Sequence, residues 1–395
     1  MNFNPQMALN YAAALARPRR VGTGGDEEVA TEIAEKLRGW GYEVERQPFT
    51  FSTAPQVFLT LVVLAASVLV LTMLLAHERF SIIADVAAVA LVLLVVLFMP
   101  LKRRVQSAAL EQNGRGLQWG QRFTTANLVA TPPSTSLRSA QDALPHLYLV
   151  AHYDSKSQRM PLAARIALFM LAISAGLILV ILTLLEVSTI FYLPIGLLAL
   201  AAAIPLLFLD AGNNSPGAID NASSVGLVLH LAEVLAQRAD WQDKLHLTIL
   251  IPSAEELTLM GSVAYVTAYE ALLRKQDRSG RLHVLNFDGV GIDGDLYTVG
   301  RSHPAPNSDR ISLLRRVQNA CTELDLPLKR FGFVGALFDH IPFAQRGFDA
   351  ISLIAIGRAS RSVHTPADAI DQLHVRGFDQ AGRVALHVID SLIQL

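Results

Sequence analysis

The sequence contains little charge for its length. Only 17% of its 395 residues are Asp, Glu, Lys or Arg, whereas an ordinary soluble domain has about 25%. The 33 basic and 34 acidic residues nearly cancel, so no excess of positive charge supports binding to nucleic acid. Apolar residues make up 52% of the chain, and the fold has to place this excess somewhere.

Cysteine is almost absent as well. The single residue, Cys321, excludes an intramolecular disulfide and any metal site built from several thiolates. A lone cysteine is compatible with a reducing compartment. The N-terminal segment also lacks the apolar core of a secretory signal peptide, and its basic residues come last.

The apolar excess is concentrated in four stretches, at residues 57–76, 80–101, 166–185 and 187–209. Their one charged residue is Asp85, near the start of the second stretch. About 20 apolar residues span the hydrocarbon core of a bilayer, so each stretch is long enough to cross it. Because very short polar connections join the stretches in pairs, we expect two transmembrane helical hairpins. Buried core helices, the alternative, would usually keep a polar stripe.

Basic residues flank these stretches mainly on one side. Ten of them adjoin the polar parts of the chain: Arg17, Arg19, Arg20, Lys102, Arg103, Arg104, Arg115, Lys156, Arg159 and Arg165. The opposite side offers only Arg79. Because positively charged loops stay on the cytoplasmic side, we expect an integral membrane protein with four transmembrane helices and its polar domain in the cytoplasm.

Outside the hairpins, apolar strands alternate with helices. We predict strands at 42–51, 147–151, 245–252, 282–287 and 350–356, and helices at 27–37, 222–237, 259–274 and 371–394. Strands that are apolar throughout are typical of a parallel sheet covered on both faces. The predicted fold class is α/β, with a mostly parallel mixed sheet, helices on both faces and two inserted hairpins. Residues 1–56, 102–160 and 210–395 would form the polar domain, and 57–101 and 161–209 the hairpins.

Acidic and histidine side chains follow the predicted strands or precede a helix. Seven are placed in this way: His152, Asp154, Asp220, Glu255, Glu256, Asp288 and His364. In open α/β sheets the carboxyl ends of the strands meet at one edge, where ligands bind. Each residue alone has an ordinary structural explanation, such as a helix cap for Asp220. Together they are ligand types that suit zinc, so we expect a metal site at this edge.

The number of candidate ligands indicates two zinc ions. Asp220 is the candidate bridging carboxylate, since such a group can hold two ions about 3.5–4 Å apart. His152 and Asp288 would complete one site, and Glu256 and His364 the other.

The remaining side chains receive supporting roles. Glu255 is adjacent to a ligand and free to act as general base. Asp154 could hydrogen-bond His152 and orient its ring, and Asp368 could do the same for His364. The other histidines considered, His146, His230, His340 and His387, are left as structural.

Six motifs carry a family resemblance. They are AHYDS (151–155), GAIDNASS (217–224), SAEELTLMGS (253–262), NFDGVG (286–291), FDHIPF (338–343) and VHTPAD (363–368). Together they resemble the aminopeptidase family with two co-catalytic zinc ions, relatives of bacterial leucyl aminopeptidases and glutamate carboxypeptidase. The resemblance covers the polar parts from about residue 17 onward. It implies a membrane-anchored metallopeptidase, expected to be an exopeptidase, in which Glu255 activates water for attack on a peptide.

The chain differs from the family in an inserted hairpin between two of the motifs and in three residues within the motifs. His152 and Asp220 are 68 positions apart, of which residues 161–209 account for 49 and leave an ordinary spacing of 19. Thr258, Ser224 and Gly289 differ from the family's motifs, which bears on substrate specificity more than on metal binding.

Two other functions remain open. One is an acyltransferase like the glutaminyl cyclases, which use one zinc, so zinc stoichiometry would distinguish it. The other is a non-catalytic membrane scaffold of the same fold. The cleavage specificity and the oligomeric state do not follow from the sequence.

Overall fold

The computed structural model describes residues 3–133, 144–209, 211–278, 281–300, 311–332 and 336–394. The chain divides into two compact units. One comprises Met1–Thr50, Phe123–Ser157 and Gly212–Leu395, and the other comprises Phe51–Arg122 and Gln158–Ala211. Each unit therefore collects segments that lie far apart in the sequence.

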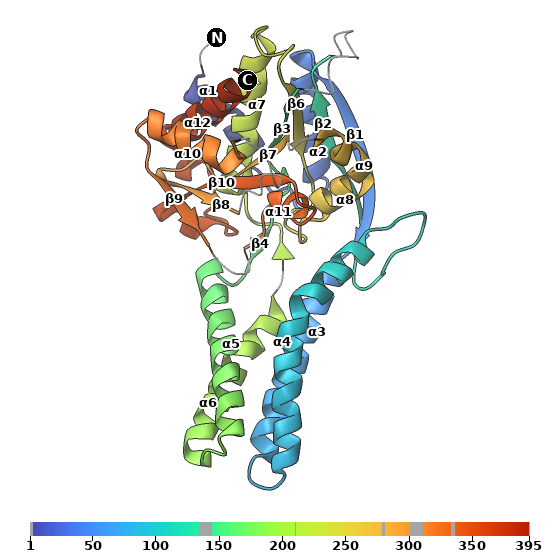
Figure 1. Ribbon diagram of the computed structural model, residues 1–395, viewed down its shortest axis with the longest axis vertical. Coiled ribbons are helices and arrows are strands. Elements are labelled where there is room, and N and C mark those ends of the chain that lie inside the picture. The colour runs from blue at the N-terminus through green and yellow to red at the C-terminus, as the bar shows by residue number, and fades with distance from the viewer. Residues whose placement is uncertain are drawn as a thin grey trace. The chain divides into compact units, whose positions relative to one another are not determined.

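The first unit is built on a sheet of eight described strands (Figure 1), in the order β1-β2-β6-β3-β7-β10-β8-β9. The strands are β1 Glu43–Ser52, β2 Arg122–Thr131, β3 His146–Val150, β6 His246–Ile251, β7 Leu282–Asp288, β8 Gly294–Val299, β9 Leu328–Phe331 and β10 Asp349–Gly357. The central strands β6, β3, β7 and β10 are parallel, whereas β2 and β8 pair antiparallel with β6 and β10. The mostly parallel mixed sheet predicted from the sequence is therefore confirmed.

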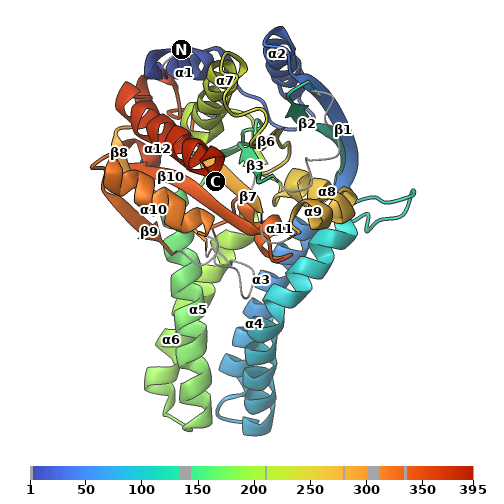
Figure 2. The same cartoon turned by 45° about the horizontal axis from the view of Figure 1, so that its top comes forward.

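Helices cover both faces of the sheet. One face carries α1 Pro5–Leu15, α2 Gly25–Gly39, α7 Ser223–Ala236, α10 Leu313–Glu323 and α12 Val375–Ile393, and the other carries α8 Met260–Ala268, α9 Glu270–Gln276 and α11 His340–Ala344. Along β3, Leu147 and Leu149 pack on the first face, and Tyr148 and Val150 on the second. Because successive strand residues point to opposite faces, a strand buried on both sides has to be apolar throughout. On the first face α1, α7 and α12 pack side by side (Figure 2).

Several elements differ from the prediction. The helix expected at 259–274 is two helices, because the backbone leaves the helical conformation at Tyr269 (φ −109°, ψ 17°), whose hydroxyl donates to Glu45. The C-terminal helix α12 begins only at Val375, after a short 3₁₀ turn at Ile370–Gln372. The elements α1, β2, β8, β9, α10 and α11 were not predicted.

The second unit contains the four apolar helices expected as hairpins, α3 Ala54–Ala76, α4 Ser81–Ala109, α5 Leu162–Leu184 and α6 Thr189–Ala203, with a 3₁₀ turn at Ile204–Phe208. Their common core holds Met73, Ala88, Leu179 and Tyr192, one from each helix. Two-residue strands, β4 Ser157–Gln158 and β5 Ala211–Gly212, pair where the second hairpin begins and ends.

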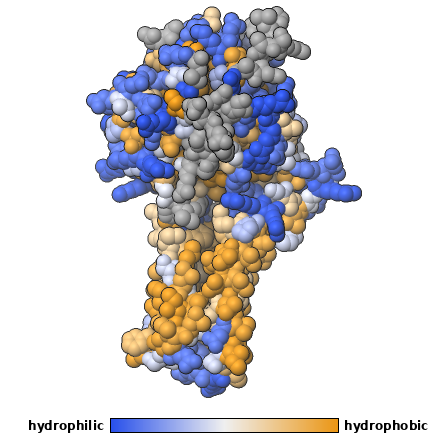
Figure 3. All heavy atoms as spheres, viewed as in Figure 1, coloured by the Kyte–Doolittle hydropathy of each residue, from blue (hydrophilic) through white to orange (hydrophobic). Residues whose placement is uncertain are grey.

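Large apolar side chains face outward from these helices. Figure 3 shows such side chains covering the visible face of the helices. Ile82 is 76% exposed and Ile190 is 74% exposed. Among the described residues, five helices are long and apolar enough to cross a membrane, but in the fifth, Ala218–Ala236, 89% of the apolar window is buried in the protein. That fifth helix is the core helix α7 with the turn before it.

Candidate metal centre

The predicted ligands converge from five segments of the first unit. Their atoms form two clusters, His152 with Glu255 and Asp288, and Asp220 with Glu256 and His364; within each cluster the atoms lie within 4.8 Å of one another. His152 follows β3, the glutamate pair follows β6, Asp288 ends β7, and His364 comes after β10. The edge of the sheet at which the sequence predicted a site therefore holds all six side chains.

Asp220 belongs to the second cluster and also faces the first. Its Oδ1 is 3.2 Å from Nε2 of His152, and its Oδ2 is 3.0 Å from Nε2 of His364. Two ligands on one tetrahedral zinc, with bonds of about 2.0–2.2 Å, lie roughly 3.3–3.5 Å apart. Each oxygen of the Asp220 carboxylate thus faces a different imidazole. Each oxygen–nitrogen distance is close to that between two ligands of one zinc ion.

The tautomer of His152 tests whether a cation fits here. Its Nδ1 lies 3.2 Å from the backbone carbonyl of Asp154, which can only accept a proton. Nδ1 therefore carries the hydrogen, and Nε2 presents a lone pair toward the carboxylate of Asp220. Both Nε2 of His152 and Oδ1 of Asp220 are buried without a hydrogen-bond partner among the described atoms. Two acceptors that face each other at 3.2 Å need a proton or a metal ion between them, and with a neutral His152 the pair fits a metal ion.

The second cluster includes a lysine. His364 Nε2 lies 3.1 Å from Oε1 of Glu256, whose Oε2 is 2.6 Å from Nζ of Lys156. Lys156 also donates to the backbone carbonyl of Glu256 at 3.3 Å. Since the ammonium group occupies Oε2, it leaves Oε1, which has no other hydrogen bond among the described atoms, to face the centre of the cluster.

Hydrogen bonds to backbone amides hold the loops of the site together. The carboxylate of Asp154 accepts from the amides of Glu255 and Glu256 at 3.1 and 3.3 Å. Asp368 accepts from the amides of Ile219 and Asp220 at 2.6 and 3.4 Å. Asp368 therefore orients the Asp220 loop, and the prediction that it hydrogen-bonds His364 is wrong.

Asn221 links two further loops. Its amide donates to the carbonyl of Phe287 at 3.1 Å and accepts from the amide of Gly289 at 3.0 Å. Gly289, which stands where the family has methionine, has a φ of +63°, a conformation that favours glycine. Asp220 and Asp288 are thereby connected through their neighbours.

The pKa of Glu255 is shifted in the opposite direction from that of Asp220. Burial raises the pKa of Glu255 well above its ordinary value, although His152 opposes the shift. Burial would also raise the pKa of Asp220, but its contacts with His152 and His364 lower it well below the usual range. Bound cations would lower both values. The carboxyl group of Glu255 is therefore protonated more readily than that of Asp220. This property suits a group that accepts and donates a proton near neutral pH.

Two basic residues that the sequence assigned to the membrane flank lie instead at this site. Lys156 pairs with Glu256, and Arg19 is fully buried beside the loops of His152 and Asp220. The sequence gives a weak signal for Lys156, which directly follows the AHYDS motif. It gives none for Arg19, which stands in an ordinary run of basic residues.

The remaining polar groups considered have structural partners. Asp339 accepts from the hydroxyl of Ser262, and burial raises its pKa to about 6. His340 contacts Ser352 at 2.7 Å, and burial lowers its pKa to about 4, so the imidazole is neutral. His230 contacts Glu233 at 2.9 Å. None of the histidines left as structural lies in either described ligand cluster.

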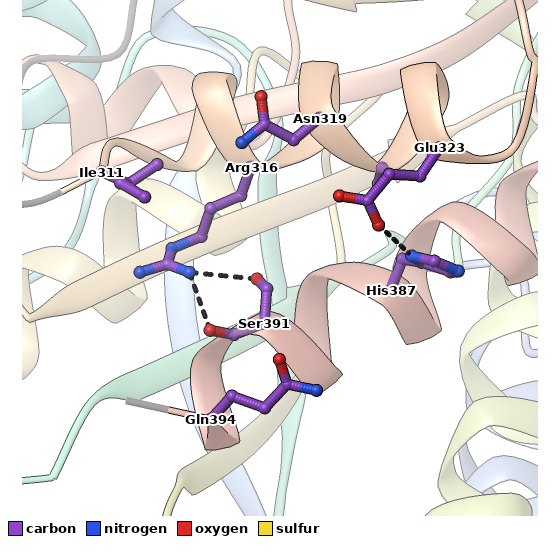
Figure 4. A pocket seen from close by; sticks show the side chains of 8 residues that line it. Ile311, Arg316, Asn319, Glu323, His387, Ser391 and Gln394 are labelled. Atoms are coloured by element: carbon purple, nitrogen blue, oxygen red, sulfur yellow. Dashed lines mark hydrogen bonds and ion pairs between the residues drawn. The ribbon is translucent and has the colours of Figure 1, made fainter.

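A pocket between α10 and α12 lies apart from this chemistry (Figure 4). Arg316 crosses it and donates to the carbonyl and hydroxyl of Ser391 at 2.9 and 3.0 Å. None of the predicted site residues lines this pocket. Its polar groups are largely paired with each other, so we assign it no ligand.

Comparison with known proteins identifies the family. Residues 128–389 match the model for peptidase family M28, which is about two thirds of the chain. The chain therefore belongs to peptidase family M28.

Individual relatives are distant. Aminopeptidase YwaD of Bacillus subtilis (strain 168) is 29% identical over 185 residues, which is 42% of this chain and 36% of that protein. The chain thus aligns with little more than a third of that relative.

Solved structures show the shared fold. A zinc aminopeptidase from Bacillus subtilis, BSAP, aligns with a TM-score of 0.56 and 15% identity, over 99% of this chain and 95% of that one. A glutaminyl cyclase from an Acidobacteriales bacterium aligns with a TM-score of 0.54 and 14% identity, over 100% of this chain and 96% of that one. Because aminopeptidase and cyclase share this fold, only the site can distinguish the two reactions.

Proposed function

We propose that this chain is a zinc-dependent exopeptidase, an aminopeptidase, that hydrolyses peptides at a site holding two zinc ions. The observation that carries the proposal is the position of Asp220, whose two oxygens face His152 at 3.2 Å and His364 at 3.0 Å. His152, Asp288 and Asp220 would hold one ion, and His364, Glu256 and Asp220 the other. Three protein ligands for each ion leave a position open for water or substrate, as in catalytic zinc sites.

The charge of the site supports two ions over one. Seven carboxyl groups gather here, from Asp154, Asp220, Glu255, Glu256, Asp288, Asp339 and Asp368. Arg19 and Lys156 lie among these groups. Burial raises the pKa of Glu255, Asp288, Asp339 and Asp368, so bound cations would favour the ionised carboxylates, and two ions would supply twice the positive charge of one. Buried carboxylates require such compensation.

Zinc at this site would polarise the substrate carbonyl and lower the pKa of a coordinated water toward neutrality. Glu255 lies in the first cluster, with Oε2 at 3.9 Å from Nε2 of His152. Glu255 would accept a proton from the attacking water and then donate it to the leaving amine. Lys156 would hold Glu256 in place, and Asp154 would keep both glutamates aligned through their amides.

Metal content and product identity test the proposal together. Zinc per chain would be measured on detergent-purified protein, beside assays with aminoacyl amides, dipeptidyl amides and an N-terminal glutaminyl peptide. We expect about two zinc ions per chain and release of free amino acids that a chelator abolishes and added zinc restores. Absence of metal, together with no turnover after zinc is added, would contradict the proposal and favour a scaffold.

The glutaminyl-cyclase-like reaction is the second candidate, favoured by structures such as the Acidobacteriales cyclase that share this fold. One zinc per chain and a pyroglutamyl product from the glutaminyl peptide would support it. The close contact of Asp220 with His152, beside its separate contact with His364, favours two ions and hence the peptidase.

We also propose that α3, α4, α5 and α6 cross a membrane and that the catalytic unit lies in the cytoplasm. The outward apolar side chains of these helices support embedding in lipid. After removal of Arg19 and Lys156 from the flanking set, the charge asymmetry is still carried by Lys102, Arg103, Arg104, Arg115, Arg159 and Arg165.

A further inference from the structure

Arg19 is a fully buried cation held by backbone carbonyls alone. Its side chain has 0% exposure. The guanidinium donates to five carbonyls, those of Leu15, Arg17, Tyr153, Pro216 and Gly217. Burying an unpaired charge is costly, so a guanidinium placed here needs a compensating reason.

Three of the five acceptors come from the two loops that carry predicted ligands. Nε of Arg19 donates to the carbonyl of Tyr153 at 2.5 Å, between His152 and Asp154. Nη1 and Nη2 donate to Pro216 at 2.5 Å and Gly217 at 2.8 Å, on the approach to Asp220. The planar fork of an arginine can hold two such loops in a fixed geometry, which a lysine cannot.

Two further hydrogen bonds join the backbone of Arg19 to the loop that follows His152. The amide of Arg19 donates to Oγ of Ser155 at 3.2 Å, and the amide of Ser155 donates to the carbonyl of Arg19 at 3.3 Å. Gly217 has a φ of +60°, and a Cβ there would lie 3.0 Å from Nη1 of Arg19. The glycine therefore permits the close approach of the guanidinium.

We propose that Arg19 is a positioning residue for the metal centre. Its hydrogen bonds hold the His152 loop against the Asp220 loop, and its charge lies behind the carboxylates that face the ions. The N-terminal segment thereby becomes part of the metal site. This inference rests on the proposed two-zinc site, because it concerns the assembly of its ligands.

Zinc affinity tests the role of Arg19, measured by competition with a chromophoric chelator. Substitution of groups that orient metal ligands typically weakens metal binding about 10–100-fold. We expect losses in this range for both Arg19→Gln, which removes the charge, and Arg19→Lys, which keeps it with fewer donors. Arg19→Lys also serves as the milder variant if Arg19→Gln does not fold.

Arg316→Gln is the matched control. Arg316 is another buried arginine, 6% exposed, whose hydrogen bonds to Ser391 lie apart from the metal site (Figure 4). The Arg316→Gln substitution should lower the melting temperature of the protein, while its zinc affinity stays within fivefold of the wild type. An affinity loss below fivefold in Arg19→Lys, or an equal loss in Arg316→Gln, would overturn the proposal.

Hydrogen exchange separates this inference from the proposed function. In the metal-free protein, Arg19→Lys should speed amide exchange in residues 151–157 and 212–222 but not along α12. Unchanged exchange in those loops would overturn the role of Arg19 even if zinc binds. Absence of zinc binding by the wild type would count against the two-zinc proposal alone.

A second observation concerns the basic end of α4. Lys102 lies 21 positions after Ser81, the first residue of the helix, which is about 32 Å at 1.5 Å per residue. This matches the roughly 30 Å hydrocarbon core of a bilayer. Lys102, Arg103 and Arg104 would therefore lie at the level of the lipid headgroups if α4 begins at the opposite interface.

Hydrogen bonds hold the segment after α4 against the end of α4 and the start of α3. The amide of Leu117 donates to the carbonyl of Ala108 at 2.6 Å, and the amide of Thr53, just before α3, donates to the carbonyl of Gln121 at 2.8 Å. Trp119 in this segment is 45% exposed. Exposed tryptophan is typical of the interface between membrane and water.

The charge of this segment is one-sided. Arg103, Arg104 and Arg115 are exposed. Glu111 is the only acidic residue between positions 102 and 122, and it pairs with Arg122 at 2.7 Å. We infer that residues 102–121 bind the headgroups of anionic phospholipids, which attract basic segments beside a transmembrane helix. This inference rests on the proposed membrane insertion.

Quenching of tryptophan by brominated lipids tests the inference, with the chain reconstituted in bilayers. At equal quencher density, brominated phosphatidylglycerol should quench at least twice as strongly as brominated phosphatidylcholine. Replacing Arg103, Arg104 and Arg115 by Gln should abolish the preference. Replacing the exposed Arg278, Arg330 and Arg361 by Gln should not.

Two controls make the outcome decisive. Trp119→Phe should remove most of the quenching, since Trp241 is only 1% exposed and Trp40 belongs to the first unit, not to that of the apolar helices. Equal quenching by both lipids, or a preference that survives the Arg103, Arg104 and Arg115 substitutions, would overturn the inference. Failure of the chain to insert into bilayers would instead contradict the proposed membrane location.

Discussion

Glu255→Gln should reduce turnover about 10²–10⁴-fold while the chain still binds about two zinc ions, because positioned general-base catalysis contributes rate factors of this size. Glutamine keeps the shape of the side chain but cannot accept the proton of the attacking water. The measurement is steady-state turnover of an aminoacyl amide beside zinc content per chain.

The two readouts distinguish the possible roles of Glu255. It lies in one cluster with His152 and Asp288 and could therefore bind the first ion itself. Loss of one zinc in Glu255→Gln would identify it as a ligand, and turnover within tenfold of the wild type would remove it from the mechanism. Glu35→Gln, an exposed glutamate on α2, serves as the control and should leave both values unchanged.

Asp220→Ala should lower the zinc content from about two to below one per chain and abolish turnover, because one carboxylate faces both clusters. Its oxygens lie 3.2 and 3.0 Å from the two imidazoles, so each ion would lose a ligand at once. Bound ligand stabilises a protein by about 2.7 kcal/mol at a hundredfold excess over Kd. The rise in melting temperature that zinc produces should therefore disappear in the variant.

A variant on the surface provides the comparison for Asp220. Asp379 lies on α12 with a side chain 42% exposed and pairs loosely with Arg383 at 3.6 Å. Asp379→Ala should retain both ions, full turnover and the zinc-dependent rise in melting temperature. Retention of one tightly bound zinc by Asp220→Ala would show that the clusters bind metal independently and that Asp220 is no bridge.

Most of the candidate metal centre could be predicted because most of its side chains come at or just after the end of a buried strand. His152, the glutamate pair and Asp288 follow strands β3, β6 and β7, whose apolar runs are unmistakable in the sequence. Parallel strands end at one edge of a sheet, so local patterns alone predicted which side chains meet. The hydrogen-bond partners of Asp154 and Asp368 could not be predicted in this way. Both side chains accept from backbone amides, and every residue type except proline has such an amide.

The sequence by itself determined the α/β class, the apolar helices and the set of candidate ligands, because strands buried on both sheet faces and helices able to span a bilayer both require long apolar runs. Only the tertiary structure decided which basic residues belong to the site. Arg19 and Lys156 resemble their basic neighbours in the sequence, but Arg19 is buried among carbonyls, and Lys156, 14% exposed, pairs with a buried carboxylate, both from distant segments. The sequence alone does not distinguish a charged residue that is buried at a site from one that is exposed on the surface. Its role depends on how far it is desolvated and on which partners the fold brings to it.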